Sequence, residues 1–295
     1  MRSFRLPCRP LAAPLLALAV ATAGLASGVT GAAAQPEKCP RMVAAAAPLR
    51  VAALGPGTGA QSPVLRLAQM STREASAQAS GNVRLSFIGH ATFLIESPAG
   101  VTIATDYNDY VRPAIVPDVV TMNRAHDTHY TDMPEAGIAH VLRGWNPDGG
   151  PVNHELTLDD VWIRNVPTNI RRGSGTLYDG NSMFVFEVAG VCIAHLGHLH
   201  HLLTPEHVEA LGRIDVVLAP VDGSYTLDLE GMVEVLKEIG APLVIPMHYF
   251  SSWGLERFLT RLGQGYKIER SAEPTVLLSR ESLPREPTVL VLPGR

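Results

Sequence analysis

Short apolar runs separated by turn residues begin at residue 82, and this texture is typical of β-strands. Gly89 and Pro98-Ala99-Gly100 punctuate the first runs. The runs predict strands over residues 83–88, 91–96, 101–105, 119–122, 161–166, 183–188 and 191–194. This part of the chain is therefore expected to form sheets.

From residue 204 the pattern alternates between helix and strand. Thr204-Pro205-Glu206 combines an N-cap residue with a proline at the first helical position, which predicts a helix ending near Leu211. Further strands are predicted over 214–219 and 243–247, and further helices over 227–239, closed by Gly240, and near 255–262. Strands first and β-α-β units later predict an α+β sandwich flanked by helices.

The N-terminal region differs in composition from the rest. Three arginines, at positions 2, 5 and 9, precede an uncharged Ala/Leu-rich stretch over 11–26, and Ala32-Ala33-Ala34 provides the small residues of a cleavage site. We expect residues 1–34 to be a signal peptide. The competing interpretation is a retained membrane anchor, but the stretch is poor in large apolar side chains. Residues 35–81, rich in Ala, Pro and Gly, are expected to be a linker, and residues 82–295 the folded domain.

Composition and charge exclude several classes of protein. The chain has 295 residues and is 46% hydrophobic, which is enough for a core and excludes a fully disordered chain. Its formal net charge of −4 becomes −7 once a signal holding three arginines and no acidic residue is removed. That balance argues against nucleic acid as a partner. A cleaved signal predicts a periplasmic or secreted protein with no stable membrane insertion, in which Cys39 and Cys192 meet an oxidising compartment as two thiols or as a bridge.

Histidine is the residue type whose placement matters most. Seven of the 11 histidines follow predicted strands: His126 and His129, then His195, His198, His200 and His201, then His248. Loops at one edge of a sheet are where binding sites assemble, and neutral imidazole suits zinc and other borderline divalent metals. Taken singly, each could be a solvated loop histidine or a hydrogen-bonded core histidine. Taken together, they predict a metal site.

Several motifs occur in an order that resembles the metallo-β-lactamase superfamily. They are Phe87-Ile88-Gly89-His90-Ala91-Thr92-Phe93-Leu94-Ile95-Glu96, Ile103-Ala104-Thr105-Asp106, the two histidine groups, Pro220-Val221-Asp222-Gly223 and residues 244–249. The likeness covers about residues 82–295 and is greatest to the branch of L-ascorbate-6-phosphate lactonase and similar zinc-dependent hydrolases. It implies an αββα sandwich, a site for one or two metal ions at one edge, and hydrolysis by a metal-bound hydroxide.

The chain departs from the family pattern at the metal motif. The family's His-x-His-x-Asp-His falls on Arg124, His126, Thr128 and His129, and a guanidinium cannot ligate a metal. His198 stands where the family has a bridging aspartate, and no histidine occurs near Asn169, where the family has one. The resemblance therefore implies one ion rather than two, with zinc expected and another divalent metal as the alternative.

The resemblance also assigns candidate roles. It implies convergence of His129, His198 and His248, with His126 as the next ligand and His195 after it. Asp106 is expected to hydrogen-bond a ligand histidine, and His90 to lie behind the ligands or to pack. Asp127 is a candidate catalytic residue; its alternatives are a pair with Arg124, metal ligation, or capping of its loop.

The substrate is expected to be a small molecule. Arg124 and Arg171-Arg172 favour an anionic group such as a phosphate or carboxylate near the site, whereas Arg124 could instead be a structural ion-pair partner. The sequence thus predicts an exported, metal-dependent hydrolase of an ester, lactone or phosphoester, with Arg124 and Asp127 as candidate catalytic residues. The alternative is a non-catalytic periplasmic protein that binds a metal or a ligand.

Overall fold

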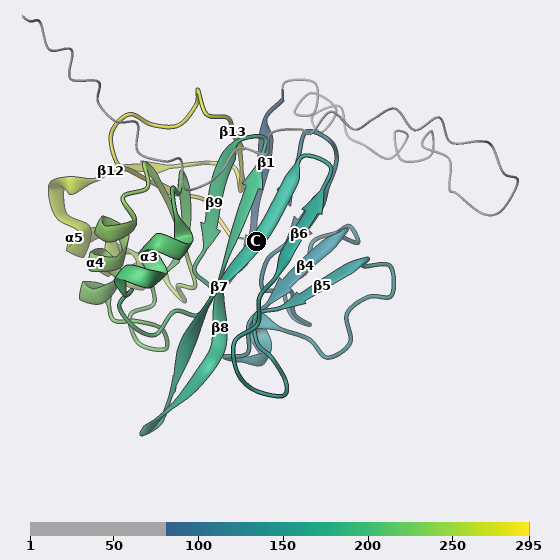
Figure 1. Ribbon diagram of the computed structural model, residues 1–295. Coiled ribbons are helices and arrows are strands. Elements are labelled where there is room, and N and C mark those ends of the chain that lie inside the picture. Colours follow the sequence, from purple (N-terminus) through teal and green to yellow (C-terminus); the bar gives the residue numbers. More distant parts are fainter. Residues whose placement is uncertain (1–80, 295) are drawn as a thin grey trace, which may run out of the picture. The chain divides into compact units, whose positions relative to one another are not determined.

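The computed structural model describes residues 81–294, which form two facing β-sheets (Figure 1). The predicted signal peptide at 1–34, and the predicted linker at 35–81 apart from Gly81, lie outside the described residues, as does Cys39. Within residues 81–294, no helix is both long and apolar enough to cross a bilayer.

The smaller sheet has six strands in the order β13-β1-β2-β3-β4-β5. Its strands are β1 (Val83–Gly89), β2 (Thr92–Glu96), β3 (Thr102–Ala104), β4 (Val119–Met122), β5 (His140–Arg143) and β13 (Thr275–Leu278). The pairs from β13 to β3 are antiparallel, whereas β3, β4 and β5 run parallel.

The larger sheet has eight strands in the order β12-β14-β11-β10-β9-β8-β7-β6. Its strands are β6 (Glu155–Leu158), β7 (Val161–Arg172), β8 (Gly175–Val188), β9 (Val191–His195), β10 (Val216–Pro220), β11 (Leu243–Met247), β12 (Lys267–Arg270) and β14 (Thr288–Val291). The strands from β6 to β9 are antiparallel, and those from β9 to β12 are parallel.

Successive side chains of a strand point to opposite faces of its sheet, so the central strands of the larger sheet contribute to two hydrophobic cores, one on each face. On β10, Val216 and Leu218 join the core between the sheets, while Val217 and Ala219 face the helices on the other side of the sheet. Because both faces of this central parallel strand are buried, its sequence is continuously apolar rather than alternating. That explains why the hydrophobic pattern located this strand so well.

The helices connect the parallel strands and cover the outer face of the larger sheet (Figure 1). They are α3 (Pro205–Leu211), α4 (Leu229–Ile239) and α5 (Ser252–Leu262). Side chains of Thr204, Asp228 and Ser251 cap their N-termini, and Gly240 closes α4 in the left-handed conformation with φ 65°. The predicted α+β sandwich is confirmed.

The outer face of the smaller sheet is covered differently. Tyr107, Met122, Ile138 and Trp145 form a small buried cluster there with Ala104 and Val120. Within residues 81–294, the α-helices all belong to the layer on the larger sheet. Trp145 packs edge-on against Tyr130 in this cluster, with ring centroids 5.6 Å apart.

Two strands are much longer than the hydrophobic pattern predicts. The apolar runs end at Val166 and begin again at Met183, yet β7 and β8 pair in register from Val161↔Val188 to Arg172↔Gly175. The polar ends of both strands form a two-stranded ribbon that extends from the sheet (Figure 1). Because the tip packs against little, it carries no apolar signal. Five strands outside the prediction, β5, β6, β12, β13 and β14, are each only four residues long.

Candidate metal centre

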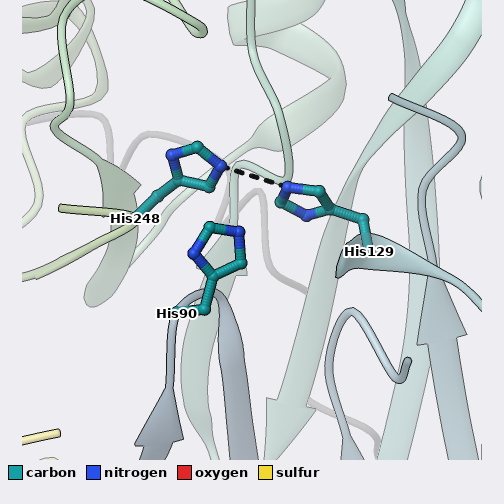
Figure 2. A group of neighbouring side chains, drawn as sticks. All are labelled: His90, His129 and His248. Atoms are coloured by element: carbon teal, nitrogen blue, oxygen red, sulfur yellow. Dashed lines mark hydrogen bonds between the residues drawn. The ribbon is translucent and has the colours of Figure 1, made fainter. Parts of the chain in front are cut away.

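Three histidines from distant parts of the chain point toward one another at one edge of the sandwich (Figure 2). His90 lies in the β1–β2 turn, His129 ends the short 3-10 helix η1 (Asp127–His129) after β4, and His248 follows β11. One ring nitrogen from each lies within 4.8 Å of the others. His129 and His248 are buried and His90 is half-buried.

Two of these rings are held by carboxylates on their outer nitrogens. His129 Nδ1 donates to Asp106 Oδ2 at 2.6 Å, and His248 Nδ1 donates to Asp222 Oδ1 at 3.0 Å. The Nε2 atoms of the two rings face each other 3.2 Å apart (Figure 2), and a proton on either one makes this contact a hydrogen bond. When neither Nε2 carries a proton, both present lone pairs, and a cation between them satisfies both. The edge of a tetrahedral zinc site with nitrogen ligands is about 3.3 Å, close to this separation.

His198 adds a fourth ring to the group. Its centroid lies 4.9 Å from those of His129 and His248. Its Nδ1 lies 2.7 Å from His200 Nε2, and Asn181 Oδ1 accepts from its backbone N–H at 2.8 Å. Its Nε2 is buried and has no hydrogen-bond partner within the described residues. A buried nitrogen of this kind is costly unless something binds it.

His126 borders the group on its solvent side. Its ring centroid lies 4.8 Å from that of His198 and 6.3 Å from that of His129. His90 closes the other side, with its centroid 4.2 Å from that of His248 and its Nε2 3.2 Å from Thr128 Oγ1. Thr128 stands at the family's aspartate position, and its hydroxyl hydrogen-bonds the His90 ring.

Burial favours the neutral form of His90, His129 and His198. Burial, followed by the effect of His248, lowers the pKa of His90 to about 4. The same two causes hold the pKa of His129 well below its ordinary value, and burial followed by His129 strongly lowers the pKa of His198. A neutral imidazole keeps the lone pair that a metal ion needs, so the group is competent to bind metal near neutral pH.

The two supporting carboxylates lie in different surroundings. Asp106 is fully buried, which raises its pKa to about 6, although Asn123 Nδ2 donates to it at 2.9 Å. Burial would also raise the pKa of Asp222, but hydrogen bonds from His248 and Thr226 hold it well below its ordinary value. Both groups therefore remain hydrogen-bond acceptors for their histidines at neutral pH.

Three of the six non-glycine residues with positive φ among the described residues lie at the same group. His90, Asp106 and His248 adopt left-handed conformations with φ values of 53°, 42° and 55°. Residues with side chains rarely adopt such angles without compensation, and their clustering is typical of functional sites. The backbone N–H of His248 donates to the carbonyl of His90 at 2.7 Å, which ties the two turns together.

The structure does not bring His195 into the group. Gly197 donates its backbone N–H to His195 Nδ1 at 3.1 Å, so Nε2 carries the proton and donates to the Ala91 carbonyl at 2.8 Å. Both ring nitrogens are thus engaged with backbone, and neither offers a free lone pair. His195 therefore joins the turn before β2 to the end of β9.

The two candidate catalytic residues lie apart from the buried rings. Asp127 is exposed beside His126, and its Oδ2 accepts from the Tyr110 hydroxyl at 2.8 Å. Arg124 is also exposed, and its backbone N–H donates to the Gly180 carbonyl at 3.3 Å. Within the described residues, Asp127 lines the pocket over the histidines and Arg124 does not.

The adjacent histidines His200 and His201 face opposite ways. His200 contacts His198, whereas His201 Nε2 accepts from the Asn169 backbone N–H at 3.1 Å. The sequence predicted no ligand role for His90, and Asp222 stood in the quoted motif Pro220-Val221-Asp222-Gly223 without an assigned role. The available signal for Asp222 was its position directly after β10, at the same edge as the histidines.

The donor set fits a divalent metal ion that accepts imidazole ligands. His90, His129 and His248 bring three ring nitrogens within 4.8 Å of one another, carboxylates fix the orientation of His129 and His248, and His198 adds a buried Nε2 without a partner within the described residues. Ligand histidines whose second nitrogen is held by a carboxylate are a recurring feature of zinc sites.

Comparisons with known proteins agree with this geometry. The profile of the beta-lactamase superfamily domain matches residues 84–248. A UPF0173 metal-dependent hydrolase of Methanoculleus marisnigri is 29% identical over 182 residues, which is 57% of this chain and 81% of that protein. A second, from Thermoplasma acidophilum, is 26% identical over 57% of this chain and 84% of its own length.

A solved structure is similar over most of the described region. It is a metallo-β-lactamase superfamily protein of Thermotoga maritima, with a TM-score of 0.53 and 31% identity over 72% of this chain and 100% of that chain. The profile covers more than half of the chain and ends at His248, so the matched region includes all five clustered histidines.

Proposed function

Since the chain belongs to the β-lactamase superfamily, we propose that it is a hydrolase that holds one zinc ion at His129, His198 and His248. His90 and His126 flank these ligands on either side. The substrate is a small molecule with an ester, lactone or phosphoester bond. The names of the relatives, metal-dependent hydrolases, support the reaction class.

The observation that carries the proposal is the pair of facing nitrogens. His129 Nε2 and His248 Nε2 lie 3.2 Å apart, while Asp106 and Asp222 hold the opposite nitrogens. A cation between these two nitrogens would be bound by both of them. The Nε2 of His198 is buried without a partner within the described residues, and it can serve as a further ligand when its Nδ1 donates to His200 Nε2.

Each residue contributes a separate part of the chemistry. A bound zinc ion would supply Lewis-acid activation of water and of the scissile carbonyl or phosphoryl group. Asp106 and Asp222 fix the tautomers of His129 and His248, which increases the basicity of their inner nitrogens. Asp127 lies in the pocket wall, where its carboxylate can take a proton from an incoming water or substrate hydroxyl.

Metal analysis combined with a substrate panel tests the proposal. Purified full-length protein is expected to hold about one equivalent of zinc, and to hydrolyse at least one of a simple ester, a lactone and a phosphodiester. A chelator should abolish turnover and added zinc should restore it. Bound zinc without turnover on any class would instead favour a non-catalytic binding protein, and absence of bound metal after zinc loading would refute the site.

We also propose that the mature protein is exported. The proposal is supported by the charged start and the uncharged Ala/Leu-rich stretch at residues 11–26. Fractionation of cells followed by N-terminal sequencing should find a chain starting near Gln35 outside the cytoplasm. A full-length chain retained in the cytoplasm would contradict export without affecting the metal site.

A further inference from the structure

A pocket of about 330 Å³ opens over the proposed zinc ligands. Its walls include His90, His126 and His248, the carboxylate of Asp127, and the rings of Tyr225 and Phe250. A volume of this size accommodates a small molecule in contact with the histidines. The chemistry of the walls therefore indicates which small molecules the pocket accepts.

Two aromatic side chains stand exposed in this pocket. Tyr225 is 58% and Phe250 is 64% exposed, although large aromatic rings usually bury most of their surface. Their centroids lie 5.6 Å apart at an interplanar angle of 73°. Phe250 also lies edge-on to His248 at 5.3 Å, so a molecule next to the proposed ligands would contact its ring.

The loop that carries Tyr225 is held in place before any ligand binds. Asp222 Oδ2 accepts backbone N–H donors from Ser224 at 2.9 Å, Tyr225 at 2.6 Å and Thr226 at 3.3 Å. Arg171 Nη2 lies 3.2 Å and 3.3 Å from the carbonyls of Ser224 and Thr226. The same carboxyl group that orients His248 thus positions an aromatic wall, and Arg171 is directed at that loop's carbonyls.

The pocket offers little to attract an anion. Among the described residues, none of those lining it is a lysine or an arginine, and Asp127 contributes a negative charge. Arg172 acts electrostatically on His126 but lies outside the lining. An anionic group on the substrate would therefore meet the Asp127 carboxylate and no lysine or arginine among the residues that line the pocket.

We propose that this pocket selects an uncharged substrate whose aromatic or similarly flat apolar group packs against Phe250 and Tyr225. The reaction on such a substrate rests on the proposed hydrolase function, whereas binding of the apolar group rests only on the pocket walls. The inference replaces the anionic group expected from Arg124 by a neutral one. It narrows the proposed substrates to an ester or a lactone, because phosphomonoesters and phosphodiesters are negatively charged at neutral pH.

Binding to the metal-free, full-length protein tests the walls alone. Benzamide and benzoate have nearly the same shape and differ in charge, and their affinities can be compared by ligand-observed NMR at neutral pH. We expect benzamide to bind at least about tenfold more tightly than benzoate, because the walls hold a carboxylate and no cation. Tighter binding of benzoate, or no detectable binding of benzamide, would overturn the proposal.

Variants locate the binding surface. Phe250→Ala and Tyr225→Ala should each weaken benzamide binding by about three- to tenfold, since each removes an apolar contact face. Tyr178→Ala is the matched control, because this tyrosine on β8 is 72% exposed and does not line the pocket. Equal affinities for the control and both pocket variants would refute the assignment of the walls.

Turnover by the zinc-loaded protein tests selectivity. Phenyl acetate and its 4-carboxylated analogue are the matched substrates, and kcat/KM should favour the neutral ester by about tenfold or more. Phe250→Ala should raise the KM for phenyl acetate while zinc content stays unchanged. Preference for the carboxylated ester refutes the inference and leaves the hydrolase proposal intact. If neither ester nor any other class is hydrolysed while benzamide still binds, the hydrolase proposal fails and the pocket assignment stands.

Discussion

The loop after β4 and the loop after β9 both carry several histidines, yet the structure uses them differently. In the first loop, His129 is held by a carboxylate and presents a free nitrogen to the metal group, while His126 borders that group. In the second loop, both ring nitrogens of His195 contact backbone atoms, whereas His198 Nε2 and His200 Nδ1 are buried without a partner within the described residues.

The comparison shows that the hydrogen bond on Nδ1 decides whether Nε2 of the same ring can bind a metal ion or must donate a hydrogen bond. A carboxylate on Nδ1 leaves Nε2 as a directed lone pair, whereas a backbone donor on Nδ1 forces the proton onto Nε2 and makes the ring a donor. Proximity to a metal motif along the chain is therefore insufficient to identify a ligand. The chemical state of the ring depends on partners from other segments.

The largest expected effect separates the proposed ligands His129 and His248 from His195, whose ring contacts only backbone atoms of Ala91 and Gly197. His129→Ala and His248→Ala should each lose stoichiometric zinc, whereas His195→Ala should keep it and lose about 1–3 kcal/mol of unfolding free energy, because the Ala91 carbonyl and the Gly197 N–H lose their partner. Elemental analysis and chemical denaturation measure the two quantities. Loss of zinc from folded His195→Ala, or full zinc in both ligand variants, would reverse the distinction.

The next effect concerns the carboxylates behind the ligands. Asp106→Asn and Asp222→Asn should weaken zinc affinity by about 10- to 100-fold, because an amide no longer fixes the tautomer of the ring as a carboxylate does. Competition with a chromophoric chelator gives the affinities. Asp160→Asn is the control, since that carboxylate accepts from Ser97 and Ala99 away from the site. Unchanged affinity in both site variants would contradict the carboxylate's role.

The pH dependence of the unfolding free energy of the metal-free protein tests whether the buried histidine rings are neutral. Burial lowers the pKa values of His90 and His200 to about 4, so the unfolded chain binds more protons than the folded chain below about pH 6.5. The unfolding free energy should therefore fall as pH drops from 6.5 toward 4. Asp106, with its pKa raised to about 6, takes up a proton in the folded state and offsets part of that loss.

Thermal unfolding measured across this pH range checks the prediction. Zinc should reduce the pH dependence near neutrality, because a bound cation prevents protonation of the ligand nitrogens. A metal-free protein equally stable at pH 7 and pH 5 would show that the buried rings do not behave as neutral groups.

The smallest effect is expected at Arg124, in the first loop but outside the pocket. Arg124→Ala should change the unfolding free energy by less than about 0.5 kcal/mol, and turnover of a neutral ester by less than about twofold, because the side chain is exposed. A selective rise in KM for anionic esters would instead restore the substrate-binding role that the sequence predicted.

Much of the fold could be predicted because burial leaves a clear trace in the sequence. The strand over 119–122 and the strand over 243–247 have the predicted bounds. Thr204 caps the start of α3 and Gly240 caps the end of α4, as expected. By contrast, β12 reads Lys-Ile-Glu-Arg and is exposed along its length. Such an edge strand is held by main-chain pairing with β14, which any sequence can provide.

The sequence by itself determined the sandwich, the strand ends that carry histidines, and Asp106 as the partner of a site histidine. Only the tertiary structure decided that His90 lies against the proposed ligand His248 and that both ring nitrogens of His195 are engaged with backbone. His90 follows a glycine in a tight left-handed turn, and His195 meets the Ala91 carbonyl across 104 residues of chain. A ligand is defined by the direction of one lone pair, and the partners that fix that direction come together only when the two sheets pack.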